Sequence, residues 1–560
     1  MTAQRISWIL ASTTIVILSG GGSTSAHFVF GQPAIFDEPF NYGGPAYFNC
    51  ISADGLELYF DRPIDGRITS ANWDIYMSTR EKPGDPWSVS VRLGPTVNSN
   101  YVDSGACLSG DGLELYFTSN PPNGYGRNDI WVATRVSTDD EWEEAVNLGP
   151  PINTSDIDAV PWITADGLEL YFHSNRPGGC GGRDIWVATR SSTSDTWGEP
   201  ENLGAVVNSP ADDTCPCLSP DGLVLVFSDW ESISGPWRPG GLGRSDMWIT
   251  RRKSTADPWE PPVNLGPGVN TREYEVNPRI SPDGSVLFFT STRPGSGLGA
   301  SIRDIWQARI IPIVDFNGDG KANGRDVVIL AEHWGQSDSV CDIGPYAWGD
   351  GIVDEQDLFM LAEYLEKEVV DPTLVAHWAL DETEGVMAAD SVGDNDAVVM
   401  GDPAWQPDGG SIGGALAFDG IDDCIVTNPV PELSAGSFSI LAWVKGGTPD
   451  EVIISGGVAD WLYTNSADGS LMTALSSIAG NGVPLFSNVV ITDGRWHRIG
   501  LVWDGTSRVL LVDEQEVARD EQAELAIPDA GLIIGAGAAA NRFFSGQIDD
   551  LRIYRRAVKP

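Results

Sequence analysis

One short stretch carries oxygen-bearing side chains at a spacing that suits a metal ion. In DFNGDGKANGRD, residues 315–326, carboxylate or amide groups stand at the first, third, fifth, ninth and twelfth positions, and glycine holds the sixth. Calcium prefers about six to eight oxygen ligands, and a glycine at the sixth position permits the sharp turn around the ion. The stretch predicts a calcium loop, with an acidic turn as the alternative. The expected ligands are Asp315, Asn317, Asp319, the backbone carbonyl of Lys321, Asn323 and Asp326.

A second, less regular loop follows in WGDGIVDEQDLFMLAEYL. Its first and third positions fall on Tyr346 and Trp348, which offer no carboxylate, although Asp342 would fill the gap if this loop is longer than the first. We therefore expect one regular calcium site and one irregular site. The candidate ligands of the second are Asp342, Asp350, Asp354 and Asp357.

A short helix is expected after each loop, from VVILAEHWG and from the end of the second stretch. Paired loop–helix units of the EF-hand type, with Asp at position twelve, resemble a dockerin. The resemblance implies a small helical module over residues 312–371 that folds with calcium and docks onto a cohesin-like partner. Arg325 and Glu355–Gln356 stand where paired Ser or Thr would form the docking face, so the usual cohesin partner is not supported.

Before this module, five copies of one phrase organise the chain. ISADGLELYF, LSGDGLELYF, ITADGLELYF, LSPDGLVLVF and ISPDGSVLFF are spaced by 55 to 62 residues, and each precedes a phrase such as DIWVATR. Four short strands per copy at this period predict a radial array of blades. The copies resemble the TolB-type, WD-repeat-like β-propellers, over residues 27–311. We expect five blades, with a divergent sixth as the alternative, and a strand before the first copy that completes the last blade.

Alignment of the copies suggests a ring of acidic side chains. The position eight residues before each turn Asp is acidic in four copies, and it enters the innermost strand. A ring of this kind would attract a cation or a polyhydroxylated ligand; in the alternative, each carboxylate accepts backbone N–H groups within its own loop. The residues are Asp103, Asp158, Asp213 and Glu275.

The last part, residues 374–560, contains alternating strands at the spacing of a β-sandwich. The phrases AHWALDETEG, FSILAWVK, GRWHRIGLVWDG and FFSGQIDDLRIYRRAV resemble, in this order, the laminin G-like, concanavalin A-like jellyroll. The resemblance implies glycan or protein binding. It also implies a structural calcium held by Asp381 with Asp549 or Asp550, unless these residues cap strand ends. Trp405, Trp461 and Trp496 are candidates for stacking on sugar rings, with a place in the apolar core as the alternative, since most tryptophans of a sandwich belong to its core.

The composition limits the partners. The net charge of −45 argues against nucleic acid, whose phosphates would repel the chain. Residues 1–26 read as an export signal that is removed, with a basic start, a short apolar run and a small-residue cleavage site before His27. No later segment is apolar enough to span a membrane, so a secreted, extracellular or periplasmic protein is expected.

These features together predict a mainly β protein with an N-terminal propeller, a dockerin-like calcium module and a C-terminal jellyroll. The function we expect is non-catalytic binding of extracellular carbohydrate or protein, in an adhesion or scaffold role, with calcium as the cofactor. No catalytic residue stands out, since there are five histidines and none of the usual hydrolase motifs. The alternative is a polysaccharide-degrading enzyme, with a glycoside hydrolase-like propeller whose channel holds a pair of carboxylates.

Overall fold

The computed structural model divides into two compact units. One contains Phe30–Pro312 with Tyr346–Gly351, and the other contains Ile313–Pro345 with Ile352–Pro560. The expected export signal lies outside the described residues. The structure describes residues 28–559 except 37–39, 41–43, 65, 67–71, 231–237, 295–302, 338–339, 368, 370, 372, 394, 431–432, 434–435, 458, 476–482, 523–524, 526, 528–529 and 539–541.

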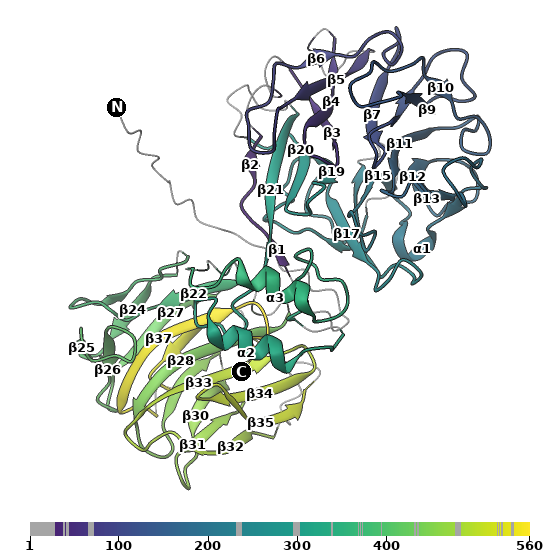
Figure 1. Cartoon of the computed structure of the whole chain (residues 1–560). Helices are drawn as coiled ribbons and strands as arrows, with labels where there is room; N and C mark the ends of the chain where they lie inside the picture. The colour runs from purple at the N-terminus through teal and green to yellow at the C-terminus, as the bar shows by residue number, and fades with distance from the viewer. Residues whose placement is uncertain are drawn as a thin grey trace, which may run out of the picture. The chain divides into compact units, whose positions relative to one another are not determined.

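The first unit is a five-bladed β-propeller, as predicted (Figure 1). Each blade is an antiparallel sheet, and the innermost strands contact one another in the order β3, β7, β11, β15, β19 and back to β3. The ring closes because β2 pairs with β21 of the last blade, which confirms the strand expected before the first copy.

The strand bounds follow the repeats. Blade 1 contains β3 (Tyr47–Ile51), β4 (Glu57–Pro63), β5 (Trp73–Thr79) and β6 (Val91–Arg92), and blade 2 contains β7 (Asp103–Leu108), β8 (Glu114–Ser119), β9 (Asp129–Thr134) and β10 (Val146–Asn147). Blade 3 contains β11 (Asp158–Ile163), β12 (Glu169–Ser174), β13 (Asp184–Thr189) and β14 (Glu201–Asn202), followed by the single turn α1 (Gly204–Val207). Blade 4 contains β15 (Asp212–Leu218), β16 (Val224–Trp230), β17 (Met247–Arg251) and β18 (Val263–Asn264). Blade 5 contains β19 (Glu275–Ile280), β20 (Val286–Ser291) and β21 (Asp304–Pro312), with β1 (Phe28–Phe30) and β2 (Ala34–Ile35) in the same sheet.

The repeated residues hold each blade together by repeated contacts. In blade 2, the Ser109 hydroxyl donates to Asp111 at 2.6 Å and accepts the Glu114 N–H at 2.9 Å, which locks the tight turn. The Arg135 guanidinium lies 4.4 Å from the centroid of the Trp142 ring, and the equivalent Arg–Trp pairs of blades 1, 3 and 4 lie at 4.2, 4.3 and 4.5 Å. Such cation–π contacts explain why the phrase ending in Arg and the later Trp recur together.

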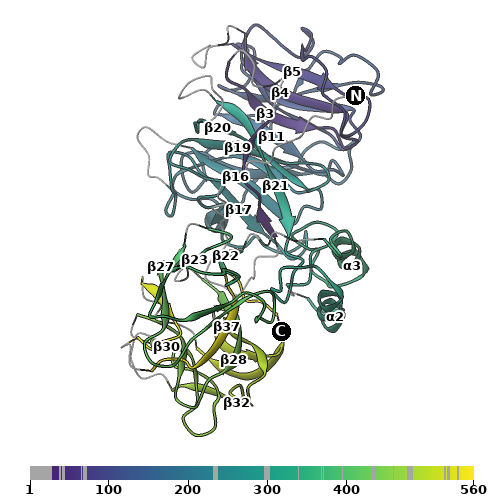
Figure 2. The same ribbon diagram turned by 90° about the vertical axis from the view of Figure 1, so that its left-hand side faces the viewer.

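The loop–helix module (residues 313–345 and 352–371 of the second unit) has two short helices, α2 (Gly324–Glu332) and α3 (Glu355–Ala362), which pack against each other (Figure 2). Each begins at a capping box, in which the N-cap side chain and the acid three residues later satisfy each other's backbone N–H groups. The apolar core is small and includes Val314, Phe316, Leu330 and Leu361.

The jellyroll consists of two sheets around one apolar core, which confirms the predicted sandwich. The first sheet contains β22 (Leu374–Trp378), β25 (Ala404–Gln406), β26 (Ala415–Ala417), β28 (Phe438–Gly446), β33 (Trp496–Trp503), β34 (Ser507–Val512), β35 (Gln515–Glu521) and β37 (Gly546–Tyr554). The second contains β23 (Met387–Ala388), β24 (Ala397–Met400), β27 (Cys424–Pro429), β29 (Val452–Gly456), β30 (Ala459–Thr464), β31 (Ser470–Thr473), β32 (Leu485–Val490) and β36 (Gly531–Ile534). Within the described ranges, no helix is long and apolar enough to cross a membrane.

Candidate functional site

A cavity of about 300 Å³ opens where the innermost strands of the propeller meet, and every blade contributes to its lining. The lining includes three aromatic side chains, Tyr47, Trp73 and Trp230, and the rings of Tyr47 and Trp73 lie 5.2 Å apart between centroids. The polar lining residues include Asp61, Asn128, His173, Arg183, Asn277 and Arg303. A concave apolar surface with a few placed polar groups is the usual form of a ligand site.

The backbone around this cavity is shaped by bulges in the inner strands. Each inner strand shifts register against its neighbour near the middle of the blade, as between Ala159 and Trp162. At the bulges of blades 3, 4 and 5, the residues Val160, Cys215 and Asn277 adopt φ values of 51°, 55° and 57°. A branched residue such as valine rarely takes this left-handed conformation, and such strain clusters at functional sites. The Val160 N–H donates to the Thr118 hydroxyl of the preceding blade at 2.8 Å, so the bulge also joins adjacent blades.

Below the bulges, Arg279 joins three blades. It is fully buried, and its guanidinium donates to the carbonyl oxygens of Asn49, Cys215 and Pro216. It also lies 5.4 Å from the Trp162 ring centroid. The side chain therefore ties the inner strands of three blades together, and it does not line the cavity.

Asp61 is the one carboxylate among the described residues that line the cavity. Its carboxylate accepts the Gly105 N–H at 2.8 Å and an N–H of the Asn49 side chain. Burial raises the pKa of Asp61 to about 7, and the nearby charge of Asp103 adds to the effect. The protonated form of Asp61 is therefore populated at a higher pH than that of an ordinary aspartate.

This pKa predicts a pH-dependent stability. The folded-state pKa exceeds the unfolded value, so the native state holds the proton that the unfolded chain loses, and stability falls as pH rises from about 4 to about 7. Asp61→Asn cannot ionise, and an amide at this position can still accept the Gly105 N–H. Between pH 4.5 and 7.5, we expect the free energy of unfolding of wild type to fall relative to the variant by as much as about 3 kcal/mol. Urea unfolding measures the difference, with the exposed Asp139→Asn as control; a pH-independent gap contradicts the assignment.

The four residues of the predicted acidic ring do not line the cavity. Asp103, Asp158, Asp213 and Glu275 are all fully buried. Asp158 accepts the Thr154 N–H at 2.6 Å and pairs with Arg176 at 2.6 Å, and the carboxylates of blades 4 and 5 pair with Arg238 and Arg293 in the same way. The carboxylates thus bond to N–H groups of their own loops, as in the alternative, and in blades 3 to 5 they also pair with an arginine of the same blade.

The inner-strand residues that line the cavity stand one or two positions after the predicted acidic position of each copy. Tyr47, Ser104, Ala159, Thr214 and Val276 share one position of the inner strand, and all line the cavity. A second position, directly before the Asp of the DIW phrase, holds Trp73, Asn128, Arg183 and Arg303 in four blades. These positions differ among otherwise similar copies, whereas their neighbours repeat. That contrast within one chain is the signal that sequence reasoning missed.

In the loop–helix module, the predicted ligands of the first loop converge. Asp315 is fully buried and accepts the N–H groups of Asp319 at 3.0 Å and Gly320 at 2.8 Å. The amides of Asn317 and Asn323 lie within 3.2 Å of the Asp319 carboxylate. Burial raises the pKa of Asp315 to about 7, so its negative charge lacks full compensation from the protein. The all-oxygen donor set, with Gly320 at φ 86° in the sixth position, fits calcium.

The second loop repeats the cap geometry over a longer span. Asp357 accepts the N–H groups of Ile343 and Asp354, as Asp326 accepts those of Phe316 and Asn323. This correspondence aligns Asp342 with Asp315, and Asp342 is buried. Residues Tyr346–Gly351, which include Asp350, group with the propeller unit, where the Trp348 indole donates to Asp221 at 2.7 Å. The loop is therefore longer than the first and supplies fewer convergent ligands.

The first loop is bound tightly to the jellyroll. Arg556, which is buried, donates to the carbonyl oxygens of Asp315 and Phe316 and pairs with buried Asp371 at 2.7 Å. Arg498 and the Tyr554 hydroxyl both donate to the Gly318 carbonyl, at 2.6 and 3.0 Å. The loop and the jellyroll consequently share one polar network.

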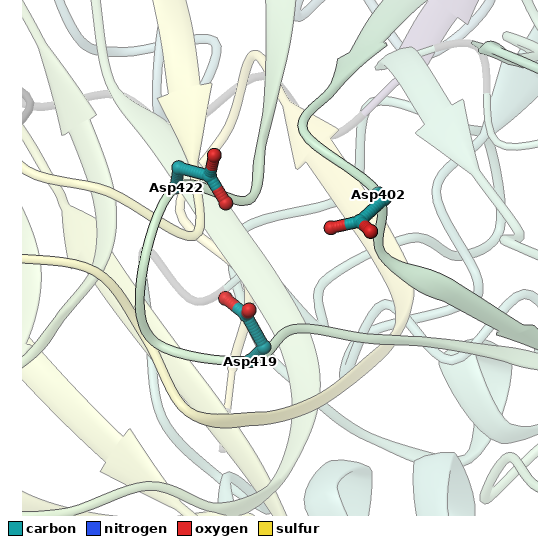
Figure 3. A group of neighbouring side chains, drawn as sticks. All are labelled: Asp402, Asp419 and Asp422. Carbon is teal, nitrogen blue, oxygen red and sulfur yellow. The ribbon is translucent and has the colours of Figure 1, made fainter.

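Two groups of acidic residues in the jellyroll could concern a metal ion. Asp381 and Asp549 both accept N–H groups from the loop 411–414, which supports a capping role, while Asp550 accepts His377 at 2.8 Å and pairs with Arg552 at 3.0 Å. Figure 3 shows a second group, in which the exposed side chains of Asp402, Asp419 and Asp422 point toward one another, with oxygen atoms within 4.8 Å. Exposed acidic groups of this kind are common without an ion, and this one carries no assignment.

The three tryptophans singled out in the jellyroll differ in exposure. Trp461 is 1% exposed and belongs to the core, so the expectation that it stacks on a sugar is wrong. Trp405 is half-buried, and its indole donates to the Gly385 carbonyl at 3.0 Å. Trp496 is also half-buried and lies 5.8 Å from the Lys445 ammonium.

Comparison with known proteins supports the jellyroll at the level of family. The profile of Laminin_G_3, the concanavalin A-like lectin/glucanases superfamily, matches residues 419–560. No curated protein matches the chain.

Solved structures show only distant likeness. Trypanosoma rangeli sialidase in complex with the inhibitor DANA aligns over 92% of both chains, at 12% identity and a TM-score of 0.35. Domain 4 of AbnA, a GH43 extracellular arabinanase from Geobacillus stearothermophilus, in complex with arabinotriose, aligns over 34% of this chain and 95% of that domain, at 19% identity and a TM-score of 0.26. TolB from Acinetobacter baumannii aligns over 48% of this chain and 54% of its own, at 15% identity and a TM-score of 0.28. All three scores lie below 0.5 and carry no functional argument.

Proposed function

We propose that this protein binds carbohydrate outside the cell through its propeller cavity, in a non-catalytic adhesion or scaffold role, with the jellyroll as a second binding domain. The observation that carries the proposal is that the aromatic side chains of Tyr47, Trp73 and Trp230 and several hydrogen-bonding groups line one cavity. The C–H faces of a sugar ring pack on aromatic rings, and its hydroxyl groups bond to polar side chains. A cavity with both kinds of lining suits a saccharide better than a purely apolar or purely charged ligand.

The jellyroll adds support of a different kind. Its family profile describes lectins and glucanases, which act on carbohydrate. Trp405 and Trp496 remain candidates for sugar contact because both are half-buried.

Calcium is proposed as a structural cofactor. Asp315, Asn317, Asp319, the Lys321 carbonyl, Asn323 and Asp326 would hold the ion in the first loop, with Asp342, Asp354 and Asp357 as weaker candidates in the second. The ion would neutralise the buried carboxylates and stiffen the loop that Arg556 binds. We also propose that the module clips onto the jellyroll rather than docking through Arg325, since the Arg325 side chain pairs with Glu514.

One observation favours the enzymatic alternative. Asp61 combines an aromatic cavity with a pKa near 7, which is the environment of a general acid in glycoside hydrolysis. A second carboxylate would then have to come from outside the described lining.

A glycan array with the full chain in calcium tests the proposal. Binding to spotted glycans that stay intact is the expected result. Loss of the spotted glycan would replace the binding role with hydrolysis, and silence on every spot would remove carbohydrate as the ligand.

A further inference from the structure

Arg303 is the one cation of the described cavity lining whose charge is met by no ion pair. Its guanidinium lies 5.3 Å from the ring centroids of Tyr47 and Trp230 and 5.6 Å from that of Tyr274. No carboxylate among the described residues pairs with it, whereas Arg183, the other lining arginine, lies 3.9 Å from Asp212. Burial lowers the pKa of Arg303 to about 10, so the group remains charged at neutral pH while it is partly removed from water.

Among the described residues, none accepts a hydrogen bond from the Arg303 guanidinium. Its five N–H groups lie in one plane and can therefore meet an acceptor from a ligand. A partly desolvated cation without a counter-charge is costly, and an anionic ligand removes that cost. The matching acceptor is a carboxylate, which takes two parallel N–H groups from one arginine.

The other titratable groups of the cavity do not compensate the positive charge of Arg303. The Asp61 carboxylate is turned to the Gly105 N–H and the Asn49 amide, and it does not pair with Arg303. Burial holds the pKa of His173 well below its usual value, so this side chain is neutral. The cavity therefore presents a local positive charge in a chain whose net charge is −45. A nonspecific acidic surface would show the opposite.

We propose that the propeller cavity recognises an acidic saccharide, in which a uronate ring stacks against Trp230 and its neighbours while the uronate carboxylate binds the Arg303 guanidinium. The inference rests on the proposed function, since it names the class of sugar that the same cavity takes. The volume of about 300 Å³ suits one or two sugar rings.

The test compares each acidic ligand with its own neutral form. Oligomers of galacturonate, glucuronate and mannuronate–guluronate are titrated into the full chain by calorimetry, beside the same oligomers after their carboxylates have been reduced to alcohols. At least one uronate is expected to bind tenfold or more tightly than its reduced form. Raising the salt concentration should weaken only the carboxylated ligand.

Variants assign the effect to Arg303. Arg303→Gln is expected to lower uronate affinity at least tenfold and to leave the reduced oligomer unchanged. Arg309→Gln removes the same charge from an exposed position of β21 and should bind as wild type. Arg303→Lys keeps the charge without the paired N–H groups, so its uronate affinity should fall between those of Arg303→Gln and wild type. The unfolding temperature of each variant shows whether it folds.

The outcomes separate this inference from the proposed function. Equal affinity for uronate and reduced oligomers overturns the acidic-saccharide inference and leaves carbohydrate binding standing. Binding of sulfated neutral sugars on the array, in place of uronates, has the same consequence. Uronate binding that Arg303→Gln does not weaken also overturns it. Failure of all these oligomers and of every glycan on the array overturns both.

Discussion

Arg556→Met is expected to destabilise the unit that contains the jellyroll by about 3–5 kcal/mol. Arg556 pairs with Asp371 at 2.7 Å, and both side chains are less than a tenth exposed. Removal of the cation leaves the Asp371 carboxylate buried without its counter-charge, which is the costly way to break a buried ion pair. The substitution also removes a donor from the carbonyl oxygens of Asp315 and Phe316, although the second still accepts the Lys559 N–H at 2.8 Å. Scanning calorimetry of the full chain resolves the transition of this unit.

Two further variants locate the cause. Arg519→Met breaks an exposed pair with Glu516 and should cost less than about 1 kcal/mol. Asp371→Asn in the Arg556→Met background removes the uncompensated charge and should recover part of the loss. If Arg556→Met alone costs no more than Arg519→Met, the polar network between loop and jellyroll does not stabilise the unit.

Removal of calcium is expected to have the next largest effect, on the same unit. An ion that binds only the folded state stabilises it by about 2.7 kcal/mol at a hundred times its dissociation constant. EDTA should therefore lower the unfolding temperature of the unit that contains the loop–helix module and leave the propeller transition in place. The physical cause is that the Asp315 carboxylate is buried beside other acidic side chains, Asp319 and Asp326 among them. Burial first, and these charges second, raise its pKa, and the ion would compensate the charge.

Asp315→Asn separates the first loop from other sites. This variant loses a buried charge and one hydrogen-bond acceptor, effects of opposite sign, so its calcium-free stability should stay close to that of wild type. Its response to added calcium should be largely lost, whereas Asp139→Asn, which removes the same charge from an exposed propeller loop, should respond like wild type. A full calcium response in Asp315→Asn would place the ion elsewhere or exclude it from the first loop.

The folds of the propeller and jellyroll follow from local patterns that the sequence displays. Turn chemistry such as Ser109–Asp111, the alternation of each strand and the paired Arg and Trp of each blade recur, and each maps to a contact in the structure. The extra strand before the first copy was predictable because the last blade lacked one. Local sequence patterns suffice to predict an element whose conformation depends mainly on its own residues.

The cavity was less predictable because it depends on backbone strain and on contacts between blades. Nothing in the residue type of Val160 indicates a φ of 51°. The acidic positions attracted attention by their charge, yet partners such as Arg176 lie in other loops and bury them. Within the part of the chain that the structure describes, Arg303 has no ion-pair partner, and its sequence does not reveal this because the next residue, Asp304, is an acid that is buried and does not pair with it. Whether a charged side chain meets a partner from another loop is decided by the tertiary structure.

Calorimetric titration of a saccharide from the array into the wild type, Trp230→Ala and Trp405→Ala tests the central claim most directly. Trp230 belongs to the propeller cavity, and Trp405 is a half-buried indole of the jellyroll, so the second variant removes a candidate contact of the other binding domain. The account predicts that Trp230→Ala weakens binding at least tenfold and that Trp405→Ala retains a site of wild-type affinity. Wild-type affinity in Trp230→Ala, with binding lost in Trp405→Ala, would contradict it and place the carbohydrate site in the jellyroll.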